Sequence, residues 1–150
     1  MKKKVSIALG SDHAGFKTKE KIKDYLHENN YAFHDFGTTS EDASDYPDFA
    51  HKVASTVEKK EYSLGIVVCG SGNGVNMVVN KYPGIRSALC WKKEIASIVR
   101  RHNDANICAI PGRYIDVKEA LEIVGEFLNS EFEGGRHLRR INKIPYKNEL

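Results

Sequence analysis

The residues best suited to chemistry lie around Cys69, which is followed directly by a glycine loop, Gly70-Ser71-Gly72-Asn73-Gly74. Three glycines in five residues let successive backbone N–H groups turn toward one point, and the helix expected after them adds the positive end of its dipole. The glycine loop therefore predicts a site for an anion, or for an oxygen that becomes anionic. The same setting favours the reactive thiolate of Cys69. The alternative is a small buried hydrophobic residue, which we expect for Cys90 and Cys108.

The glycine loop lacks the signatures of the common cofactor and nucleophile motifs. A dinucleotide fingerprint needs glycine where Val75 stands, and a Walker loop needs a G-K-[ST] ending that is absent. Ser71 is not part of a Gly-x-Ser-x-Gly elbow. Neither H-E-x-x-H nor paired C-x-x-C occurs, and the six histidines show no ligand spacing. We therefore expect no metal ion, and the glycine loop is neither a dinucleotide fingerprint nor a Walker loop.

Two further pairs of residues carry groups that move protons or bind sugars. Asp12 and His13 follow the first predicted strand, so they should face the same crevice as Cys69. A carboxylate beside an imidazole can orient a sugar hydroxyl or move its proton, although helix capping is an equal alternative for Asp12. His102 and Asn103 end a predicted helix, where the histidine can bind the last carbonyls and the asparagine can be a left-handed C-cap.

The C-terminal tail carries a basic cluster. If a helix begins after Gly134-Gly135, Arg136, His137 and Arg140 fall on one side of it. Two guanidiniums with an imidazole suit a phosphate monoester. Arg113, just after the fifth predicted strand, either adds to this phosphate site or pairs with an acidic neighbour. Nucleic acid is the rival ligand, but the tail has a single aromatic residue and shows no stacking platform.

Short apolar runs alternate with longer segments of helical period, which indicates repeated strand–helix units. The run 64–69 is too apolar to be half exposed, as is typical of a central parallel strand. Pro47 is acceptable in the first turn of a helix. The predicted strands are 5–10, 31–36, 64–69, 87–90 and 107–110, and the predicted helices are 16–29, 45–59, 75–81, 92–102 and 117–129.

Five such units predict an α/β fold, a three-layer, doubly wound (Rossmann-like) five-stranded parallel sheet with the order 2-1-3-4-5. An eight-stranded barrel would need about 250 residues. Ligands of open parallel sheets bind beyond the carboxyl ends of the strands, near the point where the strand order reverses. That point lies between strands 1 and 3, which directs attention to the loop after Ser11 and to the glycine loop.

Composition limits the class of protein. The chain has 150 residues, of which 41% are hydrophobic and 29% charged, so residues 1–150 fit one globular domain. No apolar run is long enough to span a bilayer, and three cysteines in apolar surroundings suit reduced thiols in the cytoplasm. The net charge of +3 arises in the tail, about residues 134–150, because the rest of the chain is slightly acidic.

Taken as a set, eight segments in order along nearly the whole chain resemble type B ribose-5-phosphate isomerase. The wider family includes subunits of galactose-6-phosphate isomerase, which generally lack the His-Asn-Asp and Gly-Gly-Arg-His segments found here. Retention of both segments favours the ribose enzyme. The matching segments are 10–15 (GSDHAG), 36–38 (FGT), 45–47 (DYP), 69–74 (CGSGNG), 80–81 (NK), 84–86 (GIR), 102–106 (HNDAN) and 134–137 (GGRH).

The resemblance implies roles for residues of this chain. Cys69 matches the family's base, which moves a proton between C2 and C1 of the sugar. His102, with Asp12 nearby, matches the group that opens the furanose ring, and Ser71 with the loop amides matches the group that holds the enediolate oxygen. The positions associated with substrate binding are matched by His13, Tyr46, Gly70, Gly72, Asn73, Gly74, Asn103, Arg113, Arg136, His137 and Arg140.

The resemblance also implies a single sugar-phosphate isomerase domain in the cytoplasm, without a cofactor. It implies a homodimer or a dimer of dimers whose sites are shared between two chains. The expected reaction interconverts D-ribose 5-phosphate and D-ribulose 5-phosphate in the non-oxidative pentose phosphate pathway. Two alternatives stay open at this point. One is an isomerase of a six-carbon sugar phosphate, such as allose or galactose 6-phosphate, and the other is a nucleotide or nucleic-acid binding module.

Overall fold

The computed structural model describes residues 5–147 of the chain. Residues 1–4, and residues 148–150 of the predicted tail, lie outside the described residues. The strands are β1 (Ser6–Ser11), β2 (Ala32–Asp35), β3 (Leu64–Cys69), β4 (Ser87–Leu89) and β5 (Ile107–Pro111). The helices are the short 3-10 turn η1 (His13–Gly15), α1 (Phe16–Glu28), α2 (Tyr46–Glu58), α3 (Asn73–Val79), α4 (Lys93–Asn103), α5 (Val117–Asn129) and α6 (Arg136–Ile141).

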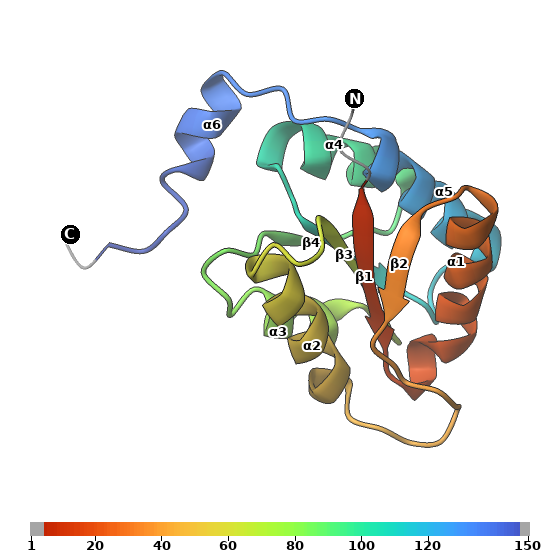
Figure 1. Cartoon of the computed structure of the whole chain (residues 1–150). Coiled ribbons are helices and arrows are strands. Elements are labelled where there is room, and N and C mark those ends of the chain that lie inside the picture. Colours follow the sequence, from red (N-terminus) through yellow and green to blue (C-terminus); the bar gives the residue numbers. More distant parts are fainter. Residues whose placement is uncertain (1–4, 148–150) are drawn as a thin grey trace.

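The five strands form one parallel sheet with helices on both faces, as predicted (Figure 1). Helices α2 and α3 pack on one face, over a core that includes Val53, Val67 and Val79. Helices α1, α4 and α5 pack on the other face, over a core that includes Ile22 and Phe127. The buried faces of these helices follow the helical period that the sequence shows.

The predicted strand order, 2-1-3-4-5, is wrong in its last two positions, because the sheet has the order β2-β1-β3-β5-β4. All five residues of β5 are buried, whereas β4 has only three residues and all three are partly exposed. A strand with neighbours on both sides must be apolar on both faces. β5 therefore takes the interior position beside β3, and β4 forms the edge.

The register of the sheet brings the ends of three strands together at its carboxyl edge. Ser11 of β1 pairs with Val68 of β3, and Cys69 of β3 pairs with Pro111 of β5. The segments that follow these strands begin with Asp12, Gly70 and Gly112, and they start side by side. Within residues 5–147, none of the helices has the length and apolar character needed to cross a bilayer.

Candidate active site

The glycine loop turns back over the end of β3 and presents the backbone amide of Gly72 to Cys69. The backbone N–H of Gly72 donates a hydrogen bond to Cys69 Sγ at 3.2 Å, and the N–H of Asn73 donates to Ser71 Oγ at 3.2 Å. Gly72 has a φ of +74°, and a methyl group on it would lie 2.5 Å from Leu89 Cδ1. Only glycine meets both demands, because a side chain would be strained there and would collide with the core. The amide of Gly72 is thus fixed beside the sulfur.

The three cysteines differ in burial. Cys69 retains 5% of its surface at the end of β3, whereas Cys90 and Cys108 are fully buried. Hydrogen bonding with Cys90, together with complete burial, raises the pKa of Cys108 well above its ordinary value. Cys90 and Cys108 are therefore structural thiols in the core, as expected. Cys69 lies directly under the glycine loop. Of the three cysteines, which all lie in the described part of the chain, it is the one whose sulfur contacts an amide of this loop.

The loop after β1 lies against the glycine loop. Asp12 Oδ1 accepts a hydrogen bond from the N–H of Gly15 at 3.1 Å, so this carboxylate caps η1. Helix capping was the alternative role predicted for Asp12. A methyl group on Gly15 would lie 2.6 Å from the carbonyl oxygen of Val68, which shows how closely η1 packs on β3. The Nδ1 atom of His13 lies 3.2 Å from the backbone nitrogen and oxygen of Ser44, which leaves Nε2 free.

Tyr46 and Arg113 complete this side of the site. A methyl group on Gly74 would lie 2.7 Å from Cζ of Tyr46, so the tyrosine ring lies directly over the first turn of α3. A methyl group on Gly70 would lie 3.4 Å from Nη1 of Arg113. The backbone N–H of Arg113 also donates a hydrogen bond to the Gly70 carbonyl at 3.0 Å. The structure brings ten predicted residues together here as a carboxyl-edge group: Asp12, His13, Tyr46, Cys69, Gly70, Ser71, Gly72, Asn73, Gly74 and Arg113.

The remaining five predicted residues lie at the opposite edge of the sheet. Helix α4 runs antiparallel to the strands, so its last residues precede β5 at the amino ends of the strands. The carbonyl of Asn103 accepts a hydrogen bond from Nε of Arg86, the residue before β4, at 2.9 Å. Helix α6 lies on the same side (Figure 1). One chain therefore does not bring His102 to Cys69. The amino-edge group consists of His102, Asn103, Arg136, His137 and Arg140.

The end of α4 differs from the prediction that Asn103 is a left-handed C-cap. Asp104, not Asn103, takes the left-handed conformation, with a φ of +45°. Its carboxylate accepts hydrogen bonds from Arg86 Nη2 and Arg100 Nη1, both at 3.1 Å. These bonds fix the turn into β5, and Asn103 stays the last helical residue with an exposed side chain. The asparagine amide is thus free for a ligand.

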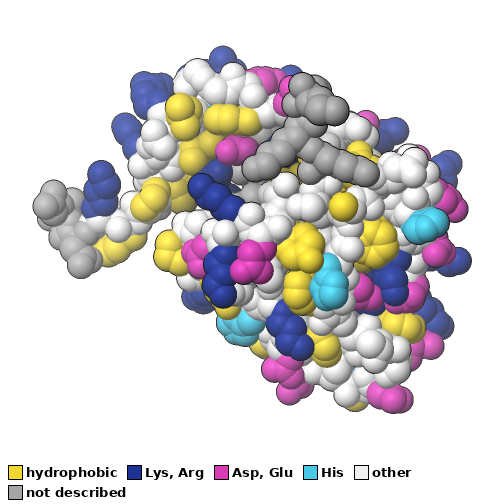
Figure 2. Space-filling view, viewed as in Figure 1, with side chains coloured by type: hydrophobic (Ala, Val, Ile, Leu, Met, Phe, Trp, Pro, Cys, Tyr) yellow, Lys and Arg dark blue, Asp and Glu magenta, His cyan; other side chains and the backbone are white. Residues whose placement is uncertain are grey.

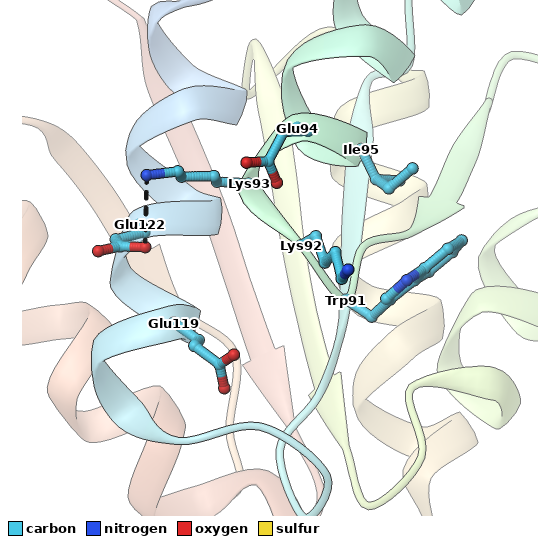
Figure 3. Close-up of a pocket in the computed structure, with 7 residues that line it drawn as sticks. All are labelled: Trp91, Lys92, Lys93, Glu94, Ile95, Glu119 and Glu122. Atoms are coloured by element: carbon cyan, nitrogen blue, oxygen red, sulfur yellow. Dashed lines mark ion pairs between the residues drawn. The ribbon is translucent and has the colours of Figure 1, made fainter.

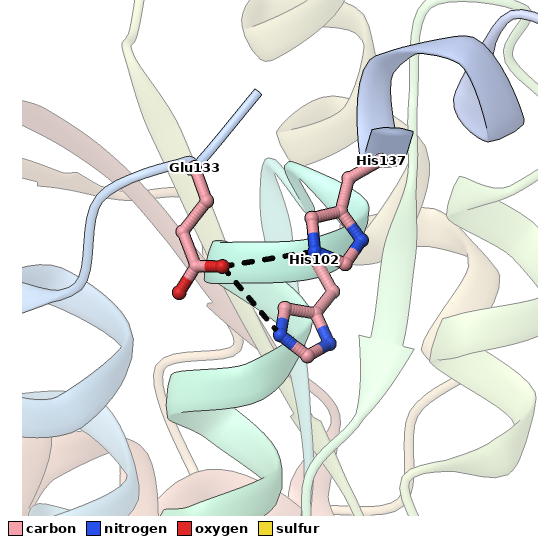
Figure 4. Close-up of side chains that lie close together, drawn as sticks. All are labelled: His102, Glu133 and His137. Carbon is pink, nitrogen blue, oxygen red and sulfur yellow. Dashed lines mark ion pairs between the residues drawn. The ribbon is translucent and has the colours of Figure 1, made fainter. Parts of the chain in front are cut away.

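The amino-edge group contains a cluster that the sequence did not reveal. The rings of His102 and His137 stack with centroids 4.2 Å apart (Figure 4). Glu133 Oε2 lies 3.8 Å from His102 Nε2 and 3.6 Å from His137 Nε2. Burial and the nearby charges of His102 and Arg136 lower the pKa of His137. The hydrogen bond from Arg101 lowers the pKa of Glu133, so this carboxylate stays ionised near neutral pH.

A separate surface cavity of about 650 Å³ lies between α4 and α5 (Figure 3). Its carboxylates include Glu94 and Glu119, and Glu122 is 3.9 Å from Lys93 Nζ. Three acidic side chains disfavour a phosphate monoester. None of the residues predicted to bind substrate lines this cavity, so we do not assign the sugar phosphate to it. The lining residues are Trp91, Lys92, Lys93, Glu94, Ile95, Glu119 and Glu122.

Comparison with known proteins matches the whole arrangement. The family model described as Ribose/Galactose Isomerase matches residues 7–144. The protein named ribose-5-phosphate isomerase B from Escherichia coli (strain K12) is 40% identical over 138 residues, which cover 92% of this chain and 93% of that protein. The solved ribose-5-phosphate isomerase B of Clostridium thermocellum has a TM-score of 0.92 at 46% identity, covering 93% of this chain and 95% of that one.

A second solved relative was determined with a ligand. Ribose-5-phosphate isomerase B from Mycoplasma genitalium, with bound ribulose-5-phosphate, has a TM-score of 0.90 at 41% identity, with 93% of each chain covered. The match to the family model and the identity to these relatives extend over both edges of the sheet. The chain therefore belongs to the ribose/galactose isomerase family.

Proposed function

We propose that this protein interconverts D-ribose 5-phosphate and D-ribulose 5-phosphate through an enediolate, without a cofactor. The observation that carries the proposal is the contact of Cys69 Sγ with the N–H of Gly72 at 3.2 Å, inside the glycine loop. This contact holds the sulfur beside the loop where the proposal needs a base, and the thiolate is the form of a cysteine that accepts a proton. The names of the relatives supply the substrate class.

In the proposed proton transfer, the carboxyl-edge group takes a proton from the substrate and returns it to the same molecule, so no other reactant is needed. The Cys69 thiolate takes the C2 proton of the open-chain aldose, and the electrons of the C–H bond form the enediolate. The hydroxyl proton of O2 passes to O1, the resulting thiol returns its proton to C1, and the ketose, with its carbonyl at C2, is formed. The amides of the glycine loop and the Ser71 hydroxyl hold the oxygen that becomes negative, which is the main source of rate enhancement in such reactions.

The substrate must be opened and held before this step. In the proposal, His102 opens the furanose ring by proton transfer, with Asp12 nearby, because an imidazole exchanges protons near neutral pH. Tyr46 and Asn103 bind the sugar hydroxyls. The phosphate is bound by charge-assisted hydrogen bonds from His13, Arg113, Arg136, His137 and Arg140.

These roles require groups from both edges of the sheet, and one chain holds the two edges apart. We infer that the active site forms between two chains of a homodimer, alone or within a dimer of dimers. The carboxyl-edge group of one chain meets the amino-edge group of its partner, and two-fold symmetry creates two identical sites. We expect the enzyme in the cytoplasm, where thiols stay reduced.

Exposed apolar side chains support such an interface. Leu138 and Ile144 on and after α6 are 49% and 61% exposed, and Met77 on α3 is 66% exposed. Figure 2 shows hydrophobic side chains on and beside the α6 segment, at the left of the view. A group of exposed apolar residues is typical of a surface that binds another protein. A partner chain would bury them and would also cover the phosphate-binding arginines.

The test is an isomerase assay on purified protein after removal of metal ions with a chelator. We expect ketose to form from D-ribose 5-phosphate faster than from allose or galactose 6-phosphate. Cys69→Ala should abolish turnover while ribose 5-phosphate still binds. A Cys90→Ala variant is the matched control and should keep the activity. Turnover by Cys69→Ala at the wild-type rate would exclude Cys69 as the base.

A further inference from the structure

We propose that His102, Glu133 and His137 form a binding site for a zinc ion, and that zinc inhibits the enzyme when it occupies this site. One nitrogen of each histidine and one oxygen of Glu133 lie within 4.8 Å of one another. Two imidazoles and a carboxylate are a known set of three protein ligands for Zn²⁺, which leaves a fourth position for water or a substrate oxygen. The proton chemistry of the proposed function needs no metal at this place.

An unsatisfied buried nitrogen is the independent sign of a ligand. His137 Nε2 is buried and lacks a hydrogen-bond partner among the described residues, in a side chain that is only 8% exposed. Its contact with Glu133 Oε2, at 3.6 Å, is too long for a hydrogen bond. A buried nitrogen without a partner is costly. A metal ion between the nitrogen and the carboxylate oxygen would remove this cost.

The chain positions the three groups by its backbone. The N–H of Glu133 donates to the carbonyl of Arg101 at 3.0 Å, which fixes the segment beside the end of α4. Gly134 and Gly135 have φ values of +67° and +58°, and this turn brings the start of α6 back over His102. Figure 4 shows the two rings on one side of the Glu133 carboxylate. The ligands thus come from three adjoining segments, which explains why their spacing in the sequence is uninformative.

Arg101 orients the carboxylate. Its Nε donates to Glu133 Oε1 at 2.7 Å, so Oε2 is the oxygen that faces the histidines. Hydrogen bonds of this kind to a metal-binding carboxylate tune metal affinity. His102 is 34% exposed and can rotate. The two rings now stack with an angle of 11° between their planes, so both imidazoles must turn to point one nitrogen each at the same ion. This turn brings the ligand atoms, which lie within 4.8 Å of one another, to the roughly 3.3 Å expected for metal–ligand bonds of about 2.0–2.1 Å in a tetrahedral site.

The ligand types select the ion. Imidazole nitrogen suits Zn²⁺, whereas Mg²⁺ and Ca²⁺ prefer sites built from several oxygens. The site offers one carboxylate, and Arg101 and Arg136 place positive charge nearby. Both features disfavour cations that are held mainly by charge. We therefore expect Zn²⁺ to bind and Mg²⁺ to be without effect at the same concentration.

The binding test uses Zn²⁺ and chelator-treated protein, in competition with a chromophoric zinc chelator. We expect one Zn²⁺ per chain. Glu133→Gln and His137→Ala should weaken binding at least about 10-fold, the lower end of the loss seen when even a supporting residue of a metal site is removed. Glu126→Gln, an exposed carboxylate on α5, is the matched control and should bind like the wild type. Circular dichroism checks that each variant is folded.

Three outcomes would overturn the zinc site. They are the absence of stoichiometric binding to the wild type, unchanged affinity in folded Glu133→Gln, and loss of binding after the cysteine thiols are blocked. The last result would place the ion on Cys69. Co²⁺ absorbance gives a second readout, because nitrogen and oxygen ligands lack the intense thiolate charge-transfer band.

The inhibition arm rests on the proposed function, because it assigns ring opening to His102. A zinc ion bound to His102 Nε2 occupies the lone pair that would exchange the proton. Zn²⁺ should therefore inhibit the wild type reversibly, with recovery on adding chelator, and the inhibiting concentration should rise at least about 10-fold in Glu133→Gln relative to its own metal-free rate. Zinc binding without inhibition would contradict the role of His102 and would leave the binding site intact.

Discussion

Replacing Gly72 with alanine should destabilise the protein by about 2–5 kcal/mol. The left-handed conformation at a φ of +74° costs an alanine about 1–2 kcal/mol. The new methyl group would also lie 2.5 Å from Leu89 Cδ1 and 3.0 Å from the carbonyl carbon of Ile110, and such overpacking costs about 1–3 kcal/mol. Part of the strain would be relieved by moving the glycine loop, so we also expect a loss of isomerase rate of about 10²-fold, as for a lost oxyanion donor.

Gly134→Ala is the matched control, because Gly134 has a similar φ of +67° with no atom within 4 Å of the added methyl group. It should lose only the conformational part, about 1–2 kcal/mol. The assay is urea unfolding of all proteins at one chain concentration, since association adds to the measured free energy. Equal losses in Gly72→Ala and Gly134→Ala would refute the steric argument, and a wild-type rate in Gly72→Ala would refute the role of the loop amides.

Three further predictions concern the phosphate and a buried ion pair. Arg113→Ala should raise KM for ribose 5-phosphate about 10- to 100-fold in steady-state kinetics, because it removes a charge-assisted bond worth about 1.5–3 kcal/mol; an unchanged KM would remove Arg113 from the phosphate site. Asp35→Asn should destabilise the fold by about 1.5–3 kcal/mol in urea unfolding, because it removes a charged hydrogen-bond partner of the fully buried Lys19, which keeps Glu20 at 2.9 Å; a loss below about 1 kcal/mol would contradict this. Burial alone would raise the pKa of Asp35, but the bonds from Lys19 and the N–H of Gly37 lower it, so its stabilisation is present above its ordinary value of 3.8 and is lost as pH falls through the lowered value. Unfolding measured from pH 6 to pH 3 should therefore depend less on pH in Asp35→Asn than in the wild type, and identical profiles would count against the pair.

Much of the fold followed from the sequence because burial leaves a periodic pattern. The apolar run of β3 and the helical period of α1 and α5 gave elements whose bounds agree with the structure to within one or two residues. The order of β4 and β5 did not follow, because both runs are short and apolar and the crossover rule allows either to lie beside β3. The polar Ser87 at the start of β4 is the sequence signal that indicates an edge strand.

Lys19 shows a second limit of the pattern. Lys19 lies between Lys17 and Lys21, which are both exposed, yet Lys19 is fully buried. It precedes Ile22 by three positions and Leu26 by seven, so it lies on the buried face of the helix. Its partner Asp35 comes from β2, and such a long-range ion pair leaves no local spacing to read.

The candidate site, like the fold, could be predicted from the sequence only where the signal is local. The glycine loop and the Asp12 turn were predictable because each directly follows a strand, and parallel strands end at one edge. The distribution of the site over two edges depends on the direction of α4, which places His102 away from Cys69. Glu133 was missed because the Gly134-Gly135 turn, rather than a continuous helix, brings it to His137.

In the proposed active site the thiol of one chain works with the histidine of the other, and mixing two inactive variants distinguishes this arrangement from a site within one chain. Cys69→Ala and His102→Ala should each be inactive as homodimers. After the two are unfolded together in equal amounts and refolded, half of the dimers are mixed, and each mixed dimer has one intact site and one site with both lesions. We expect recovery of about a quarter of the wild-type rate on ribose 5-phosphate. If the mixture stays as inactive as its parents, although mixed dimers are shown to form, both groups act within one chain and a site shared between two chains is excluded.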